Sequence, residues 1–116
     1  MAKQSTYTER DVSWMYFNHR ILQEAEKTNV PLLERLSFFG IYSNNLDEFF
    51  RVRVASLNRL VDNDNLSERN RKAIKKTLKT VNRLNEDYSS EYTKAIKEVF
   101  AQLEEHHIRL LKESQL

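Results

Sequence analysis

The sequence predicts an all-α fold, in which three long helices pack as an antiparallel bundle. The 116 residues include a single glycine and a single proline, and a β-rich domain needs more turn residues than that. Charged residues make up 31% of the chain and the mean hydropathy is −0.71, which is typical of long helices with solvated faces. Three segments repeat apolar residues at helical spacings of three and four.

The first helix is expected to run through WMYFNHRILQEAEK, with Asp11 or Ser13 as its N-cap. One apolar stripe of this segment is expected to face the bundle. It consists of Trp14, Phe17, Ile21 and Ala25, with Met15 and Leu22 beside it. The segment KTNVP then interrupts the helical pattern, because proline is tolerated in the first turn of a helix and not in its interior.

The second helix is expected from about Pro31 to about Val61, a length of roughly 45 Å at 1.5 Å per residue. Asp, Asn and Ser residues dominate the turn that follows, VDNDNLSER. The third helix is expected from about Ser67 to about His106, and its apolar residues alternate steps of four and three. This seven-residue repeat suits antiparallel packing on the other helices. The final stretch, HHIRLLKESQL, loses the repeat, so residues 1–106 are expected to form the helical domain and 107–116 the truncated start of a following head domain.

The second helix carries two adjacent asparagines within a wide apolar arc. With residues placed at about 100° intervals, the apolar residues span roughly 220°, so we expect a partner to cover part of this arc. Asn44 falls on the polar side and is expected in solvent. Asn45 falls inside the arc, where a carboxamide is costly unless its donor and acceptor are both used. Asn45 is therefore either an amide satisfied by the protein itself or one that binds a ligand such as an adenine edge.

Arg53 also lies near the centre of the apolar arc. We expect it to pair with Asp or Glu of another helix, or to extend its charged end toward solvent, in preference to binding an anion. Gly40 lies at the polar edge of the arc. It costs about 1 kcal/mol of helix stability relative to alanine, which indicates that another group approaches the backbone there.

The remaining polar motifs are expected to lie on the surface. His106 and His107 are adjacent and lack the spacing of a metal-binding pair, and His19 stands alone on a charged edge of the first helix. The run RNRKAIKKTLK is basic but contains no aromatic residue, so a solvated helix face is favoured over nucleic-acid binding. The net charge of +2 supports neither a nucleic-acid nor a membrane partner, and no complete active-site motif occurs.

Two segments resemble the N-terminal helical domain of bacterial polyphosphate kinases. They are DVSWMYFNHRILQEA and PLLERLSFFGIYSNNLDEFFRVRVASL, and the resemblance is close from about Tyr7 to Leu60. The motif GIYSNNLDEF, with SW and FN upstream of it, is the most specific part, whereas the third helix agrees only in length and position. Kinases of this family are much longer chains, so the resemblance implies that this chain is the N-terminal domain of a larger enzyme.

The resemblance implies an enzyme that transfers the terminal phosphate of ATP reversibly to polyphosphate, through a phosphohistidine and with Mg²⁺. It places the catalytic histidine and the metal ligands in C-terminal domains, so this chain is expected to hold no catalytic or metal-binding residue and to be inactive alone. The family's nucleotide-binding asparagine corresponds to Asn45, and the domain is implied to cover the adenine side of ATP.

The implied partners are ATP, polyphosphate, the remaining domains of the enzyme and further copies of the full-length enzyme, but not nucleic acid. The enzyme is expected in the cytoplasm, either free or at the membrane surface. The alternative function is a helical docking module without a ligand. In that case the wide apolar arc binds another protein, and Asn45 only fixes the register of packing.

Overall fold

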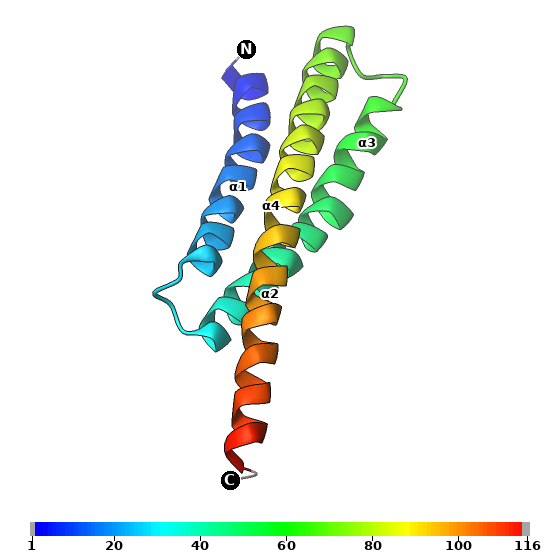
Figure 1. Ribbon diagram of the computed structural model, residues 1–116. Coiled ribbons are helices and arrows are strands. Elements are labelled where there is room, and N and C mark those ends of the chain that lie inside the picture. Colours follow the sequence, from blue (N-terminus) through cyan, green and yellow to red (C-terminus); the bar gives the residue numbers. More distant parts are fainter. Residues whose placement is uncertain (1, 115–116) are drawn as a thin grey trace.

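The computed structural model describes residues 2–114, and the side chains of residues 9–113. The described part is helical apart from two short turns, and the molecule measures 73 × 23 × 17 Å along its principal axes. Its elements are α1 (Ala2–Glu26), α2 (Leu32–Glu48), the π-helical segment η1 (Phe49–Val54), α3 (Ala55–Val61) and α4 (Glu68–Ser114). Helices α1 and α4 run in one direction and α2 and α3 in the other (Figure 1). The predicted all-α bundle is confirmed.

Helix α1 begins at Ala2, so the prediction of an N-cap at Asp11 or Ser13 is wrong. The segment before Asp11 contains no glycine or proline that would stop a helix. Asp11 instead lies in the interior of α1, where it is only 5% exposed. The capping preference of aspartate is a local property, whereas its burial here depends on a partner from another helix.

The turn between α1 and α2 is closed by Arg35. Pro31 precedes α2 with φ −56° and ψ 145°, which is outside the helical region. Arg35 is buried, and it donates from Nε to the carbonyl oxygen of Ala25 at 2.7 Å and from Nη2 to that of Glu26 at 3.4 Å. The guanidinium thereby satisfies carbonyls at the C-terminal end of α1, where the helix dipole also favours a cation.

The turn between α3 and α4 is closed by side chains from its α4 end. Ser67 caps α4, because its Oγ accepts a hydrogen bond from the backbone N–H of Asn70 at 3.2 Å. Arg71 reaches back across the turn and donates to the carbonyl oxygens of Val61 and Asn63. The predicted boundaries at Val61 and Ser67 are therefore confirmed to within one residue.

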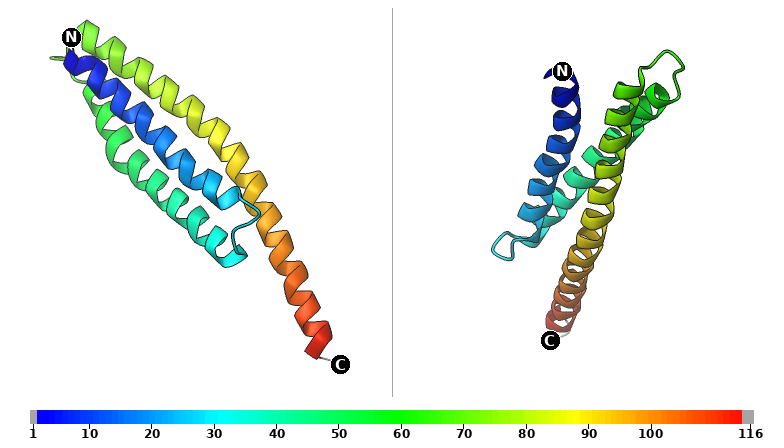
Figure 2. Two further views of the ribbon diagram at one scale, coloured as in Figure 1. Left: turned by 90° about the vertical axis from the view of Figure 1, so that its left-hand side faces the viewer. Right: turned by 90° about the horizontal axis from the view of Figure 1, so that it is seen from above.

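Helix α4 does not end near His106 as predicted, but continues to Ser114. Its last part contains no glycine or proline and is rich in Leu, Glu, Lys and Arg, which favour a helix. Residues 104–113 are all exposed, and this part of α4 projects beyond the bundle (Figures 1 and 2). A domain boundary after residue 106 stays a prediction, and residues 115 and 116 lie outside the described part of the chain.

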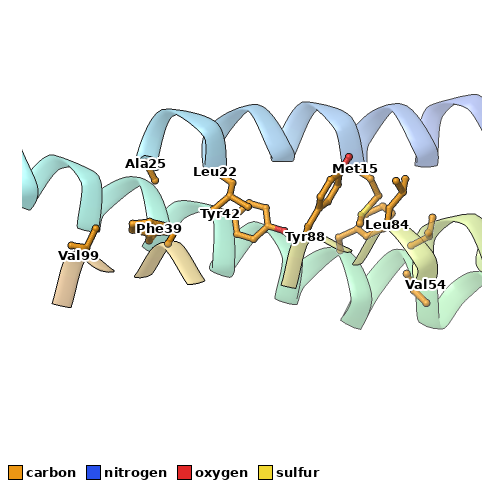
Figure 3. Packing of buried hydrophobic residues seen from close by; sticks show 12 residues of the cluster. Met15, Leu22, Ala25, Phe39, Tyr42, Val54, Leu84, Tyr88 and Val99 are labelled. Carbon is orange, nitrogen blue, oxygen red and sulfur yellow. The ribbon is translucent and has the colours of Figure 1, made fainter. Parts of the chain in front are cut away.

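The hydrophobic core lies where α1, α2 and α4 meet (Figure 3). Its members are Met15, Leu22, Ala25, Phe39, Tyr42, Phe49, Val54, Val81, Leu84, Tyr88, Ala95 and Val99. Val81, Tyr88, Ala95 and Val99 belong to the apolar repeat that was predicted for α4. In α1 the predicted stripe is only partly correct, because Phe17 is 60% exposed, whereas Met15 and Leu22, which were expected beside the stripe, are buried. The difference arises because α1 packs against both α2 and α4, so the residues that lie between these two helices are the buried ones.

Candidate functional site

Asn45 lies in the last turn of α2, where it takes part in a chain of two hydrogen bonds. Its Nδ2 donates to Oδ1 of Asn18 at 3.3 Å, and Nδ2 of Asn18 donates to the carbonyl oxygen of Tyr42 at 3.2 Å. Asn18 is 1% exposed, whereas Asn45 is only partly buried. The protein therefore uses one part of the amide of Asn45 and leaves the other part near solvent.

Asn18 is the asparagine of the FN pair in the family resemblance, but it was not predicted as a site residue. It lies four residues after Trp14 and seven before Ala25, so regular helix geometry places it on the apolar stripe of α1. A polar residue at such a position is the sequence signal that could have identified it. Its partners in α2 lie 24 and 27 residues further along the chain.

An open depression with a volume of about 340 Å³ lies beside Asn45. It is lined by Trp14, Asn45, Glu48, Phe49, Val52 and Arg53. The rings of Trp14 and Phe49 are stacked, with centroids 4.1 Å apart and an angle of 6° between their planes. Apolar aromatic surface, an amide and one charge of each sign thus border the same space, a combination that suits a planar heterocycle with polar edges.

Arg53 forms an ion pair with Asp11 of α1, as the sequence predicted for a carboxylate of another helix. Nε and Nη2 of Arg53 donate to the two carboxylate oxygens at 2.7 and 3.1 Å, which is a bidentate geometry. The side chain of Asp11 is 7% exposed and that of Arg53 is 32% exposed. Arg53 therefore ties η1 to α1 while part of its side chain borders the depression.

Half of the residues that line the depression, namely Phe49, Val52 and Arg53, belong to the π-helical segment η1. At its end the backbone N–H of Ala55 reaches the carbonyl oxygen of Phe50, five residues earlier, instead of the usual four. This wider turn alters the directions in which the following side chains point, and Val52 is 58% exposed as a result of facing away from the core. Single π-helical turns inside α-helices occur frequently at functional sites.

Asn44 and Gly40 have no part in the site. Asn44 is exposed, which confirms the prediction. Gly40 is also exposed, and a Cβ placed on it would meet no atom of its surroundings within 4 Å. The expectation of a close approach to Gly40 is therefore wrong for contacts within this chain.

The histidines behave differently from one another. His19 does not stand alone as predicted, because its Nε2 lies 2.9 Å from Oε2 of Glu91 and its ring stacks on Tyr88 at 4.0 Å. Both partners belong to α4, so this contact was not visible in the sequence around α1. His106 and His107 are exposed, as expected.

A pair of carboxyl groups accompanies His19 between α1 and α4. Burial and the neighbouring Glu91 raise the pKa of Glu26 to about 7. Burial opposes the ionisation of Glu91 too, but hydrogen bonds with Glu26 and His19 hold the pKa of Glu91 below its ordinary value. The pair thus retains a proton close to neutral pH. None of these residues lines the depression beside Asn45.

The remaining surface shows one basic face and scattered apolar residues. In the run RNRKAIKKTLK, Lys72, Lys75, Lys76 and Lys79 are all exposed, as predicted for a solvated helix face. Within the part of the chain that the structure describes, no group of three or more His, Cys, Asp or Glu side chains could hold a metal ion. No helix in that same part is both long and apolar enough to cross a membrane.

A family model described as the polyphosphate kinase N-terminal domain matches residues 7–111. The chain belongs to this family. The match extends well past Leu60, where the close resemblance in the sequence ends, and includes most of α4. The matched part of this polyphosphate kinase N-terminal domain therefore includes Asn18, Asn45 and the two aromatic residues of the depression, Trp14 and Phe49.

Curated relatives named polyphosphate kinase match the same domain. The chain is 39% identical over 123 aligned residues to one from Vibrio vulnificus (strain YJ016), covering 100% of this chain and 16% of the relative. It is 36% identical over 119 residues to one from Klebsiella pneumoniae, covering 100% of this chain and 17% of the relative. A polyphosphate kinase of Escherichia coli (strain K12) is 52% identical over 61 residues, which are 53% of this chain and 9% of that enzyme.

The chain therefore spans about one sixth of the length of its full-coverage relatives. No solved structure matches the chain.

Proposed function

We propose that this chain is the N-terminal domain of a polyphosphate kinase, which transfers the terminal phosphate of ATP reversibly to polyphosphate, and that the domain contacts the adenine of ATP through Asn45. Family membership and the name shared by the relatives support the first part. The position of Asn45 carries the second part, because the amide borders an open depression with only one of its groups engaged by the protein.

The residues around the depression have the chemistry that a purine base requires. Trp14 and Phe49 supply apolar aromatic surface for the face of the base, and Asn45 supplies polar atoms for its edge. The depression is open to solvent and shallow, so it covers only one side of a nucleotide. The opposite side and the phosphates are then left to other domains of the enzyme.

The catalytic steps are assigned to those other domains. We propose that the phosphohistidine and the Mg²⁺ ligands lie outside this chain, as the family resemblance implies, so Mg²⁺ and polyphosphate are proposed partners of the full-length enzyme. Association of the enzyme into oligomers is part of the same proposal. The role of this domain is to bind and orient ATP, which affects the concentration at which the enzyme is saturated.

Exposed apolar residues of α1, α2 and η1 are proposed to face the remaining domains. They include Tyr16, Phe17, Leu33, Ile41 and Val52, with exposed fractions between 45% and 74%. The same observation favours the second candidate, a docking module that binds another protein without a ligand. The two candidates differ in whether Asn45 affects nucleotide affinity.

The test compares Asn45→Leu with the matched control Asn44→Leu in the full-length kinase that carries this domain. Both variants make the same chemical change, but Asn44 is exposed and outside the depression. Loss of the amide contact with adenine should cost about 1–3 kcal/mol, or roughly 5- to 150-fold in affinity. The change should appear in the KM for ATP more than in kcat, since this contact is equally strong in the ground and transition states.

A normal KM for ATP in folded Asn45→Leu would contradict the nucleotide-binding role and favour the docking module. A KM raised equally by Asn44→Leu would show that the effect is not specific to the depression. Binding of the remaining domains, measured with this chain added separately, should be unaffected by Asn45→Leu if the amide serves the nucleotide alone.

A further inference from the structure

We propose that Asn18 is a positioning residue, which holds Asn45 with its oxygen directed at the base and makes the site prefer adenine to 6-oxopurines such as hypoxanthine and guanine. This proposal rests on the proposed function, because it assigns the base selectivity of that same site. It concerns a buried residue of α1 that does not line the depression.

The orientation of both amides follows from a single acceptor. The carbonyl oxygen of Tyr42 can only accept a hydrogen bond, so the atom of Asn18 that lies 3.2 Å from it must be the nitrogen. The oxygen of Asn18 is then directed at Asn45 and also accepts only. The atom of Asn45 at 3.3 Å from it must in turn be the nitrogen, Nδ2.

This arrangement determines what Asn45 can offer a ligand. No described residue forms a hydrogen bond with Oδ1 of Asn45, so this acceptor is available on the side away from Asn18. Nδ2 carries two hydrogens and uses one of them for Asn18. Rotating the Asn45 amide by 180° would place its oxygen against that of Asn18, where two acceptors repel each other in a buried environment.

The two purine types differ at the atom that such an acceptor reads. Adenine presents a donor, the N6 amino group, next to the acceptor N7, whereas guanine presents the acceptor O6 in place of the amino group. Hypoxanthine has the same O6. An asparagine with a fixed orientation can bind N6 through Oδ1 and N7 through its second N–H, but would set Oδ1 against O6. A freely rotating asparagine could not make this distinction at O6.

The experiment measures the KM of the full-length kinase for ATP and for ITP, which differ at position 6 of the purine. In the unchanged enzyme we expect the KM for ITP to exceed that for ATP about tenfold, since one hydrogen bond is lost and two acceptors are opposed. Asn18→Leu keeps a similar volume but frees Asn45 to rotate. In this variant the ratio of the two KM values should fall to within about twofold of one, with the change in KM and not in kcat.

Asn45→Leu is the comparison that separates this inference from the proposed function. It should raise the KM for ATP and lower the ratio, because the amide itself is gone. If Asn45→Leu raises the KM for ATP but the unchanged enzyme uses ITP as well as ATP, the positioning role of Asn18 is refuted and nucleotide binding stands. The positioning role is likewise refuted if Asn18→Leu keeps the same ratio of the KM for ITP to the KM for ATP as the unchanged enzyme. If Asn45→Leu has no effect on either nucleotide, both proposals fail.

The comparison of ATP with ITP in the unchanged enzyme needs no substitution, so it can refute the inference even if Asn18→Leu does not fold. A second readout on the unchanged 116-residue chain is hydrogen exchange of its side-chain amides. The Nδ2 hydrogens of buried Asn18 should exchange much more slowly than those of exposed Asn44. Equally fast exchange would show that the hydrogen-bond chain does not form.

Discussion

Removing Arg53 should destabilise the chain more than removing its partner Asp11, although the two substitutions break the same ion pair. The reason is the difference in burial, since the side chain of Asp11 is 7% exposed and that of Arg53 is 32% exposed. Arg53→Gln leaves a buried carboxylate without its guanidinium. Asp11→Asn leaves a guanidinium that already reaches solvent and can extend further into it.

The magnitudes follow from these exposures. Loss of one partner from a fully buried pair costs about 3–5 kcal/mol, and partial access of solvent to Arg53 reduces this to about 2–3 kcal/mol for Arg53→Gln. For Asp11→Asn we expect about 1 kcal/mol, because the amide keeps the shape and one hydrogen bond. The double variant should lose less than the sum of the two, with a coupling of about 1–2 kcal/mol for this bidentate geometry.

The assay is urea unfolding of the 116-residue chain, followed by its helical circular dichroism, for the unchanged chain, both single variants and the double variant. The exposed ion pair of Arg109 with Glu105 serves as the control. Arg109→Gln should cost less than about 0.5 kcal/mol, because the side chains of Arg109 and Glu105 are both exposed. The reasoning is refuted if Asp11→Asn costs as much as Arg53→Gln, or if the two single effects add without coupling.

Three further outcomes are expected. Glu26 holds its proton more tightly in the folded chain, with a pKa of about 7 against 4.5 for the free side chain, so its contribution to stability is complete below about pH 4.5 and is lost as the pH rises toward 7. Glu26→Gln should therefore match the unchanged chain near pH 4 and be about 1–2 kcal/mol more stable than it near pH 8 by urea unfolding. If the variant and the unchanged chain were equally stable at pH 8 as well, the carboxyl pair would be contradicted. Tyr42→Phe should be neutral or stabilising by up to about 1 kcal/mol in the same assay, because the buried Tyr42 hydroxyl has no hydrogen-bond partner among the described residues, and a clear loss would reveal one. The 116-residue chain alone should incorporate no labelled phosphate from ATP, and a labelled chain would overturn the assignment of catalysis to other domains.

The positions of the helices could be predicted because their signals are local. Pro31 fits only ahead of a helix or in its first turn, and Ser67 caps a helix through the backbone three residues on. The apolar repeat of α4 likewise depends on spacing alone. Where a local signal was ambiguous the prediction failed, as at Asp11, whose residue type suits both a cap and a buried ion pair.

The candidate site was predicted only in part. Asn45 and Arg53 were identified because each is a polar residue within an apolar arc, which the sequence of one helix is sufficient to reveal. Their partners were not identified from the sequence, since Asn18 lies 27 residues from Asn45 and Asp11 lies 42 residues from Arg53. The π-helical turn was also missed, because the spacing rules assume a regular α-helix.

The sequence by itself determined that the chain is helical, where its turns lie, and which polar residues of the second helix are out of place. The tertiary structure decided how those residues are satisfied, which part of the Asn45 amide remains available, and which face of α1 is buried. The physical reason is that helix formation depends on neighbours within about four residues. A buried hydrogen bond or ion pair depends instead on two helices being brought together by the core between them.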